Sequence, residues 1–166
     1  MLKGLFDIHF RMEELSRNGD PLERLNEYVV WEIFRPALEV IREKERKSSA
    51  GRKPFDVVMM FKVLVLQSLY NLSDDALEYQ IRDRLSFMRF LGLSISDRVP
   101  DAKTIWLFRE DLGKAKLIKP LFRQFEGYLR SHGFTARKGQ IVDASIVSVP
   151  IQRNSREENK QIKAGD

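Results

Sequence analysis

The sequence predicts a mainly α-helical protein, with a multi-helix bundle over residues 1–136 and the start of a second domain over residues 137–166. In the first domain, apolar residues recur with the spacing of amphipathic helices, and capping residues separate the segments. After Gly139 the apolar pattern changes to that of a β-strand or hairpin over residues 140–149. Residues 150–166 are polar, with little to bury, so we expect a disordered tail.

The composition is that of an ordinary globular protein. Of the 166 residues, 43% are hydrophobic and 32% are charged, which excludes wholesale disorder. Cysteine is absent, which excludes disulfides and thiolate zinc sites. The only histidines, His9 and His132, lie far apart in the sequence, which argues against a histidine metal site.

We expect a cytoplasmic protein without a membrane partner. The N-terminal stretch MLKGLFDIHF does not have the layout of a secretory signal peptide. The most apolar stretch, residues 55–70, contains Asp56, Lys62 and Gln67 and is shorter than the ~20 residues that cross a bilayer. This stretch therefore predicts a buried core helix.

The first two predicted helices have clear start signals. Asp20 and Pro21 are typical of an N-cap and a first helical position, and they predict a helix over residues 21–46 that Pro36 kinks or splits. A small-residue loop follows, and Pro54 then opens the core helix, which should run to about Leu72.

Three further helices follow. Ser73 caps a predicted helix over residues 74–91, which Gly92 closes. Residues 101–112 form a fourth helix, from which we expect these residues to pack inward: Ile105, Trp106, Phe108 and Leu112. Residues 117–132 form a fifth amphipathic helix, with its apolar face made of Leu117, Leu121, Phe125, Tyr128 and Leu129.

The positive charge is concentrated in two stretches. Residues 42–54 carry six basic and two acidic side chains, and residues 114–138 carry seven basic and one acidic. Arg82 and Arg89, seven residues apart on the predicted third helix, point the same way, and the helix pair resembles a helix-turn-helix in outline. The candidate DNA-contacting residues are therefore Arg52, Lys53, Arg82, Arg89, Lys119 and Arg123. A solvated helix face would show the same pattern.

Asp143 is the unusual residue of the segment GQIVDASIVSVPIQRN. Both faces of a strand over residues 141–149 are mostly apolar, which is typical of an interior strand, and Asp143 lies within it. A buried carboxylate is costly unless it is paired, hydrogen-bonded or bound to a metal. The residues alone leave open a structural role, paired with an arginine or with backbone amides, and a functional one.

Three ordered motifs carry a family resemblance. They are the run LSDDALEYQIRDRLSFMRFLGL, the run VPDAKTI and the run VDAS. Together they resemble the N-terminal half of bacterial insertion-sequence transposases of the group typified by insertion sequence five. The resemblance implies a DDE transposase, in which a helical region binds the insertion-sequence ends and a ribonuclease-H-like α/β domain carries the catalytic acids. Asp143 matches the first acid, which would bind the Mg²⁺ of the intact family.

The sequence departs from this family at the other two acids. Asp166, Glu157 and Glu158 lie in the polar tail and do not match them. We therefore expect a truncated transposase that binds DNA but has no complete catalytic triad and holds no Mg²⁺ stably. Its expected partners are the terminal inverted repeats and either a second copy or a full-length transposase. The alternative is a stand-alone helical module that binds DNA or a protein and regulates it.

Overall fold

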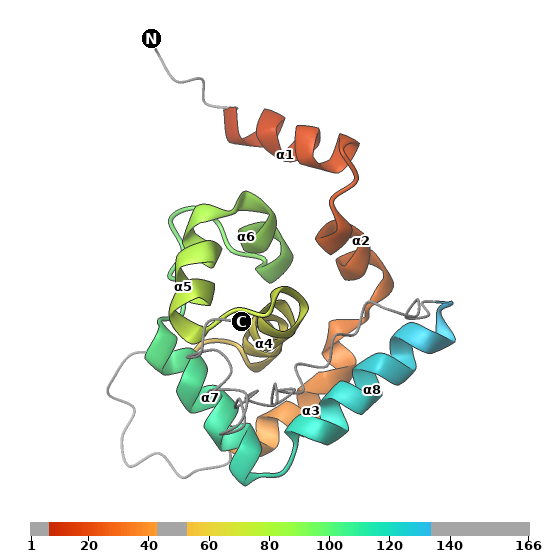
Figure 1. The fold of residues 1–166 in the computed structure, drawn as a ribbon, viewed down its shortest axis with the longest axis vertical. Helices are drawn as coiled ribbons and strands as arrows, with labels where there is room; N and C mark the ends of the chain where they lie inside the picture. Colours follow the sequence, from red (N-terminus) through yellow and green to blue (C-terminus); the bar gives the residue numbers. More distant parts are fainter. Residues whose placement is uncertain (1–6, 43–52, 134–166) are drawn as a thin grey trace, which may run out of the picture. The chain divides into compact units, whose positions relative to one another are not determined.

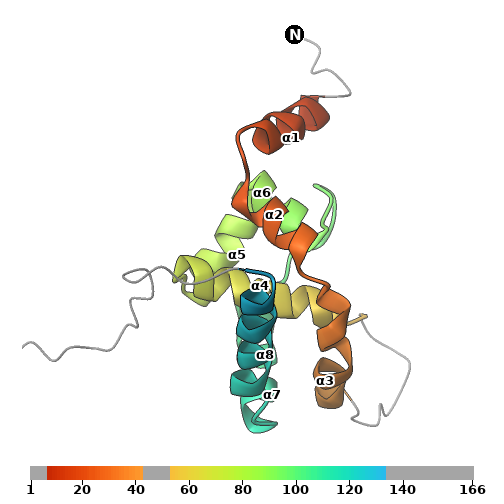
Figure 2. The same ribbon diagram turned by 90° about the vertical axis from the view of Figure 1, so that its right-hand side faces the viewer.

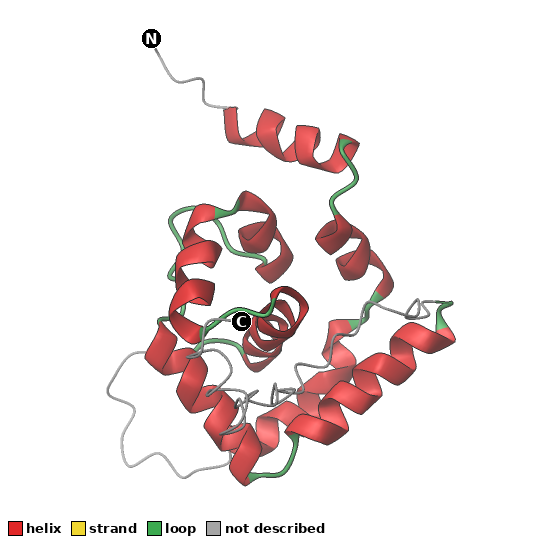
Figure 3. Ribbon diagram, viewed as in Figure 1, coloured by secondary structure: helices red, strands yellow, loops and turns green. Residues whose placement is uncertain are grey.

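The computed structural model describes residues 7–42 and 53–133, and in this part of the chain every regular element is a helix (Figures 1 and 3). The elements are α1 (Asp7–Arg17), α2 (Pro21–Tyr28), the 3-10 helix η1 (Trp31–Phe34), α3 (Arg35–Glu39), the 3-10 helix η2 (Val40–Arg42), α4 (Val57–Tyr70), α5 (Asp74–Asp83), α6 (Leu85–Leu91), α7 (Ala102–Lys114) and α8 (Ile118–Ser131).

The predicted mainly helical fold is confirmed. The predicted strand over residues 140–149 and the domain boundary at 136/137 lie outside the described residues and stay predictions. No helix in the described ranges is both long and apolar enough to cross a membrane.

Helix α4 lies at the centre of the core, as its apolar sequence predicted. The Asp56 carboxylate accepts hydrogen bonds from the amides of Val58 and Met59, at 2.9 and 3.0 Å, and so caps the first turn. Asn71 ends the helix in the left-handed conformation with φ 49°. The buried residues of α4 occupy every side of the helix: Val57, Val58, Met60, Phe61, Val63, Leu64, Val65 and Leu66.

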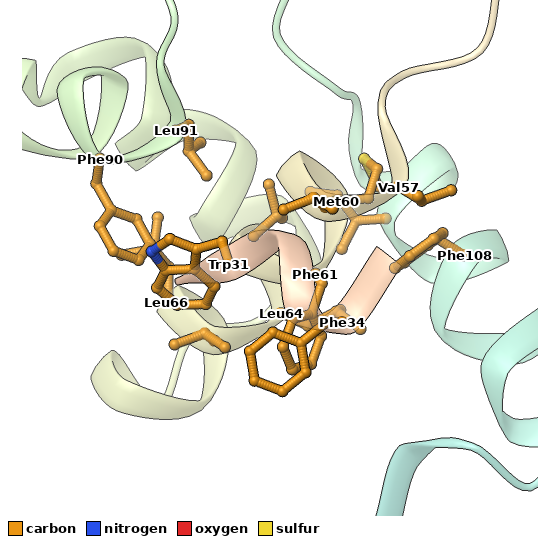
Figure 4. Close-up of a cluster of buried hydrophobic side chains, with 14 of the residues drawn as sticks. Trp31, Phe34, Val57, Met60, Phe61, Leu64, Leu66, Phe90, Leu91 and Phe108 are labelled. Atoms are coloured by element: carbon orange, nitrogen blue, oxygen red, sulfur yellow. The ribbon is translucent and has the colours of Figure 1, made fainter. Parts of the chain in front are cut away.

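Aromatic rings of η1, α4 and α6 meet in the core (Figure 4), and Phe125 of α8 joins them. The ring centroids of Phe34 and Phe61 are 4.9 Å apart. Trp31 meets Phe90 edge-on at 5.4 Å and stacks on Phe125 at 5.6 Å. Such offset and edge-on pairs add to the free energy of burying the rings. The cluster joins η1, α4, α6 and α8 in one core.

The prediction of one long helix over residues 21–46 is wrong, because residues 21–42 form several short helices. The helical chain breaks at Val29, which has extended backbone with φ −97° and ψ 118°, while Pro36 lies in the first turn of α3 and does not interrupt a helix. Val29 and Trp31 are buried and Val30 is 57% exposed. This alternation is the pattern of extended chain, and it places both Val29 and Trp31 in the core.

The predicted helix over residues 74–91 is also two helices. Arg84 has extended backbone, with φ −103° and ψ 116°, and it separates α5 from α6. In one straight helix, Leu77 and Phe90 would point in different directions. The break turns α6, so that four of its seven residues are buried: Phe87, Met88, Phe90 and Leu91.

The fourth and fifth predicted helices correspond to α7 and α8, with one error of orientation. Ile105, Phe108 and Leu112 are buried as predicted, but Trp106 is 46% exposed. Buried positions spaced three and four residues apart share one helix face, and Trp106 lies about 100° from Ile105 around the axis. Trp106 is therefore a surface residue.

Helix α1 was not among the predicted helices. Both views place it on the far side of α2 and α6 from α4 (Figures 1 and 2). It buries no residue, but it has Asp7 in its first turn and Arg17 in its last, as the helix dipole favours.

Removing the Phe61 ring should destabilise the protein strongly, because it is fully buried against Phe34 and Trp31. We expect Phe61→Ala to lower the free energy of unfolding by about 3–5 kcal/mol in urea denaturation. As a control, Ile95→Ala, at a side chain that is 55% exposed, should change it by less than about 0.5 kcal/mol. Equal effects of the two substitutions would contradict the core described above.

Candidate nucleic-acid interface

The predicted DNA-contacting residues lie in different electrostatic surroundings. Lys53 is exposed just before α4, and Arg52 lies outside the described residues. Arg82 is on α5 and Arg89 is on α6, so the break at Arg84 removes the shared helix face that the sequence predicted for them. Their DNA-binding role stays a prediction.

Arg89 is already held by acceptors from α1 and α2. Its guanidinium donates to the Ser16 hydroxyl at 2.7 Å and to the Asp20 carboxylate at 2.6 Å, and it forms an ion pair with Glu23 at 3.2 Å. It also donates to the Met12 carbonyl at 3.2 Å. The side chain is 21% exposed, and two carboxylates balance its charge.

Asp20 makes this contact structurally important. Its side chain is 6% exposed, and it also caps α2 by accepting from the Leu22 amide at 2.9 Å. Removing the arginine would leave a buried carboxylate without its cation, which is costly. The network around Arg89 therefore joins α1 and α2 to α6.

Arg82 lies among acidic side chains. It forms an ion pair with Glu78 at 3.0 Å, and the other carboxylate oxygen of Glu78 accepts from the Ala102 amide at the start of α7. Asp75 and Asp83 are exposed on the same helix. An acidic helix repels phosphates, so α5 is a poor recognition helix.

A second, half-buried network joins α4, α5 and α7. Arg109 donates to both carboxylate oxygens of Asp74, at 2.6 and 2.7 Å, and to the Gln67 side chain at 2.9 Å. The hydrogen bond from Arg109 is the main cause of the lowered pKa of Asp74, against the opposing effect of burial. The same bond raises the pKa of Arg109.

Lys62 is a half-buried cation beside the aromatic core. Its ammonium donates to the Asn26 side chain at 3.0 Å and to the Phe90 carbonyl at 3.2 Å, and it lies 5.1 Å from the centre of the Trp31 ring. Burial lowers the pKa of Lys62, and the carboxylates of Glu32 and Asp56 oppose this shift only in part. Lys62 connects α2, α4 and α6 and does not face solvent as a phosphate ligand.

Four exposed cations lie around the connection between α7 and α8. The four exposed side chains here are Lys114, Lys116, Lys119 and Arg123. Within the described residues, none of the four has an ion pair or a side-chain hydrogen bond. We call these four residues the α7–α8 basic turn. Lys119 and Arg123 were among the predicted contacts, whereas Lys114 and Lys116 were missed, although the net positive charge of residues 114–138 included both.

The backbone of this turn keeps the cations on the outside. Lys116 has a left-handed conformation with φ 56° in the connection between the two helices. Leu121 and Phe125 anchor α8 in the core, so Lys119 and Arg123 lie on its outer face. An unpaired, solvated cluster of this kind binds phosphate oxygens without first breaking an internal ion pair.

The described residues do not form a metal site. No group of three histidine, aspartate or glutamate side chains in residues 7–42 and 53–133 is placed to hold an ion. Asp143, the predicted Mg²⁺ ligand, lies outside these ranges, so its role stays a prediction.

Comparison with known protein families places the helical region in a transposase family. The family described as Transposase domain (DUF772) matches residues 10–111, which is more than half of the chain and extends from α1 into α7. No solved structure matches the chain.

The Asp74–Arg109 pair should make stability depend on pH. The folded pKa of Asp74 is lowered, so its contribution is fully present above its unfolded pKa of about 3.9 and is lost as the pH falls through the folded pKa. We expect the stability advantage of the native protein over Asp74→Asn to shrink on acidification below about pH 4, measured by urea denaturation.

Arg109, the hydrogen-bond donor to Asp74, provides a second variant that tests the same prediction. Arg109→Gln removes the donor and should abolish most of the same pH-dependent difference between the native protein and Asp74→Asn. A difference in free energy of unfolding that stays constant from neutral pH to pH 2 would show that Arg109 does not stabilise the Asp74 carboxylate.

Proposed function

This chain belongs to the transposase domain family DUF772, and we propose that it binds the DNA ends of an insertion sequence as part of a DDE transposase of the insertion sequence five group. The observation that carries the proposal is the α7–α8 basic turn, with four exposed cations that have no partner among the described residues. The other cations with a predicted role in α5 and α6 already have carboxylate partners.

The spacing of the basic turn suits a nucleic-acid backbone. Lys119 and Arg123 are four residues apart on α8, so they lie on one helix face and about 6 Å apart along the axis. Lys116 lies in the connection just before this helix. Cations repeated along one face can contact several phosphates of one strand and release their counterions.

The residues of the basic turn are suited to bind DNA phosphates, and they are not suited to distinguish one base sequence from another. Three of its four members are lysines, which bind phosphates as point charges and do not present the two-pronged guanidinium that reads guanine. Phosphate contacts position a protein on DNA, and base contacts specify the sequence. Selective recognition of the ends therefore needs base contacts from another part of the protein.

For Asp143 we propose the role of first catalytic acid. The support is the resemblance of VDAS to the corresponding transposase motif, together with the placement of a carboxylate inside an apolar run. Hard oxygen ligands are the ones that Mg²⁺ prefers. Two Mg²⁺ ions need several oxygen ligands, so we expect Asp143 to act together with the two other acids of the family.

Charge reversal in the basic turn tests DNA binding directly. The double variant Lys116→Glu/Lys119→Glu should lower the slope of log affinity against log salt by about 0.9 for each phosphate that the protein no longer neutralises, or roughly 2 in total. Fluorescence anisotropy with a labelled duplex at several salt concentrations gives this slope.

Arg24→Glu is the control for charge reversal at a single site elsewhere, because Arg24 is an exposed arginine on α2 without an ion pair in the described ranges. It should leave the slope unchanged. If the slope of log affinity against log salt is the same for the double variant and the native chain, the α7–α8 basic turn is not part of the DNA interface.

Asp143 can be tested in a fusion that supplies the other two acids. The chain is joined in frame to the C-terminal part of an intact transposase, and cleavage of insertion-sequence ends is followed with Mg²⁺. Asp143→Asn should abolish cleavage and leave DNA binding intact, while Ser145→Ala, on the same predicted strand face, should retain it. Cleavage that survives Asp143→Asn would refute the assignment.

A further inference from the structure

Helix α7 has large apolar side chains on the face that points away from the core. Trp106 is 46% exposed and Leu107 is 44% exposed, and they are adjacent in the sequence. The opposite face of α7 carries Ile105, Phe108 and Leu112 and is buried. The two side chains form only a small apolar patch, so a contact here depends on the charges beside them.

A pair of opposite charges flanks these two residues. Lys103 precedes Trp106 by three residues, and Glu110 follows Leu107 by three residues. At about 100° per residue, all four side chains fall within roughly a third of the helix circumference. We call this set, Lys103, Trp106, Leu107 and Glu110, the α7 outer face.

Neither charged side chain of the α7 outer face has a direct partner in the described residues, although Glu110 acts electrostatically on Arg109 and Lys103 on Asp101. In the part of the chain that the structure describes, Lys103 and Glu110 form no ion pair and no side-chain hydrogen bond. They are seven residues apart, which is too far for a pair along one helix, where partners are three or four residues apart. The nearest lysine at such a spacing, Lys114, does not pair with Glu110 either.

The order of the four residues is self-complementary. The midpoint of the set lies between Trp106 and Leu107, so a two-fold rotation about that point exchanges position 103 with 110 and position 106 with 107. A second α7 that runs antiparallel to the first would then present Glu110 of the partner subunit to Lys103, and the reverse. A parallel pair in the same register would place like charges together, which is unfavourable.

We propose that the α7 outer face is the contact between two copies of this chain, packed antiparallel about a two-fold axis between Trp106 and Leu107. A two-fold contact uses the same patch on both subunits, so it needs a self-complementary surface, and this one pairs apolar with apolar and cation with anion. A different partner protein would need no such symmetry in the sequence. The charge order is therefore the observation that favours a second copy.

The proposed contact between the two copies is small, so we expect its affinity to be low. Each subunit contributes about half the surface of one tryptophan and one leucine, well below the roughly 1,200–2,000 Å² of a stable interface. The dimer is therefore weak, with a Kd of roughly tens to hundreds of micromolar. The proposal does not depend on DNA binding, and DNA is absent from its test.

Charge exchange tests the antiparallel register by sedimentation equilibrium of the full chain over a wide concentration range. Lys103→Glu or Glu110→Lys alone converts two attractive pairs into two repulsive ones, and each should raise the Kd about tenfold. The double variant Lys103→Glu/Glu110→Lys exchanges the charges, restores both pairs and should return the Kd to within about threefold of the native value. Arg24→Glu, with the same charge change away from α7, should have no effect.

The apolar part of the contact is tested separately. Trp106→Ser should fold, because the side chain is on the surface, and it should abolish the dimer. A native chain that is monomeric up to about 1 mM, well above the expected Kd, would overturn the proposal. A double variant whose Kd stays as high as those of the single variants, or a dimer unaffected by Trp106→Ser, would overturn it as well.

Discussion

The burial of α4 on all sides is the constraint on which the rest of the structure depends. A helix that is apolar around its whole circumference must be covered by several others, and here α3, α5, α6 and α7 all contact it, together with η1. Polar groups near such a helix need partners inside the protein, and Lys62 finds neutral ones in Asn26 and the Phe90 carbonyl. At the ends of α4, Asp56 pairs with Arg35, and Gln67 joins the Asp74–Arg109 pair. Packing around α4 therefore decides which charges are neutralised and which remain free.

Local signals in the sequence predicted those parts of the fold that local interactions determine. Helices α2 and α5 start where the predicted caps Asp20 and Ser73 accept hydrogen bonds from amides of the first turn. Helix α4 begins at Val57, capped by Asp56, and not at the predicted Pro54. The breaks at Val29 and Arg84 have no glycine or proline at the site. They exist because the extended backbone turns apolar side chains toward the core, which is a tertiary effect. The prediction for Trp106 was wrong because the sequence pattern does not separate an apolar residue on the buried face from one beside it.

For the charged residues, too, the sequence predicted only part of what the structure shows. The sequence shows which residues are cationic, and the concentration of charge in residues 114–138 correctly indicated a basic surface at Lys119 and Arg123. It does not show which cations already have partners. The acceptors of Arg89 are 69 to 77 residues away in the sequence, so only the folded chain shows that this arginine joins α1 and α2 to α6. Helix α7 connects both proposals, since its C-terminal end opens the basic turn and its outer face offers the antiparallel contact, which would put the two basic turns at opposite ends of the helix pair.

The central claim is that the α7–α8 basic turn binds DNA, whereas Arg89 stabilises the fold by joining α1 and α2 to α6. Backbone amide NMR during titration with duplex DNA tests it most directly, because every described segment is observed at once and no residue is replaced. We expect the largest chemical-shift changes in residues 113–124, with small changes in α6 and in the α1–α2 region that holds Arg89. The largest changes in residues 82–91, with none near Lys116 and Lys119, would contradict the claim.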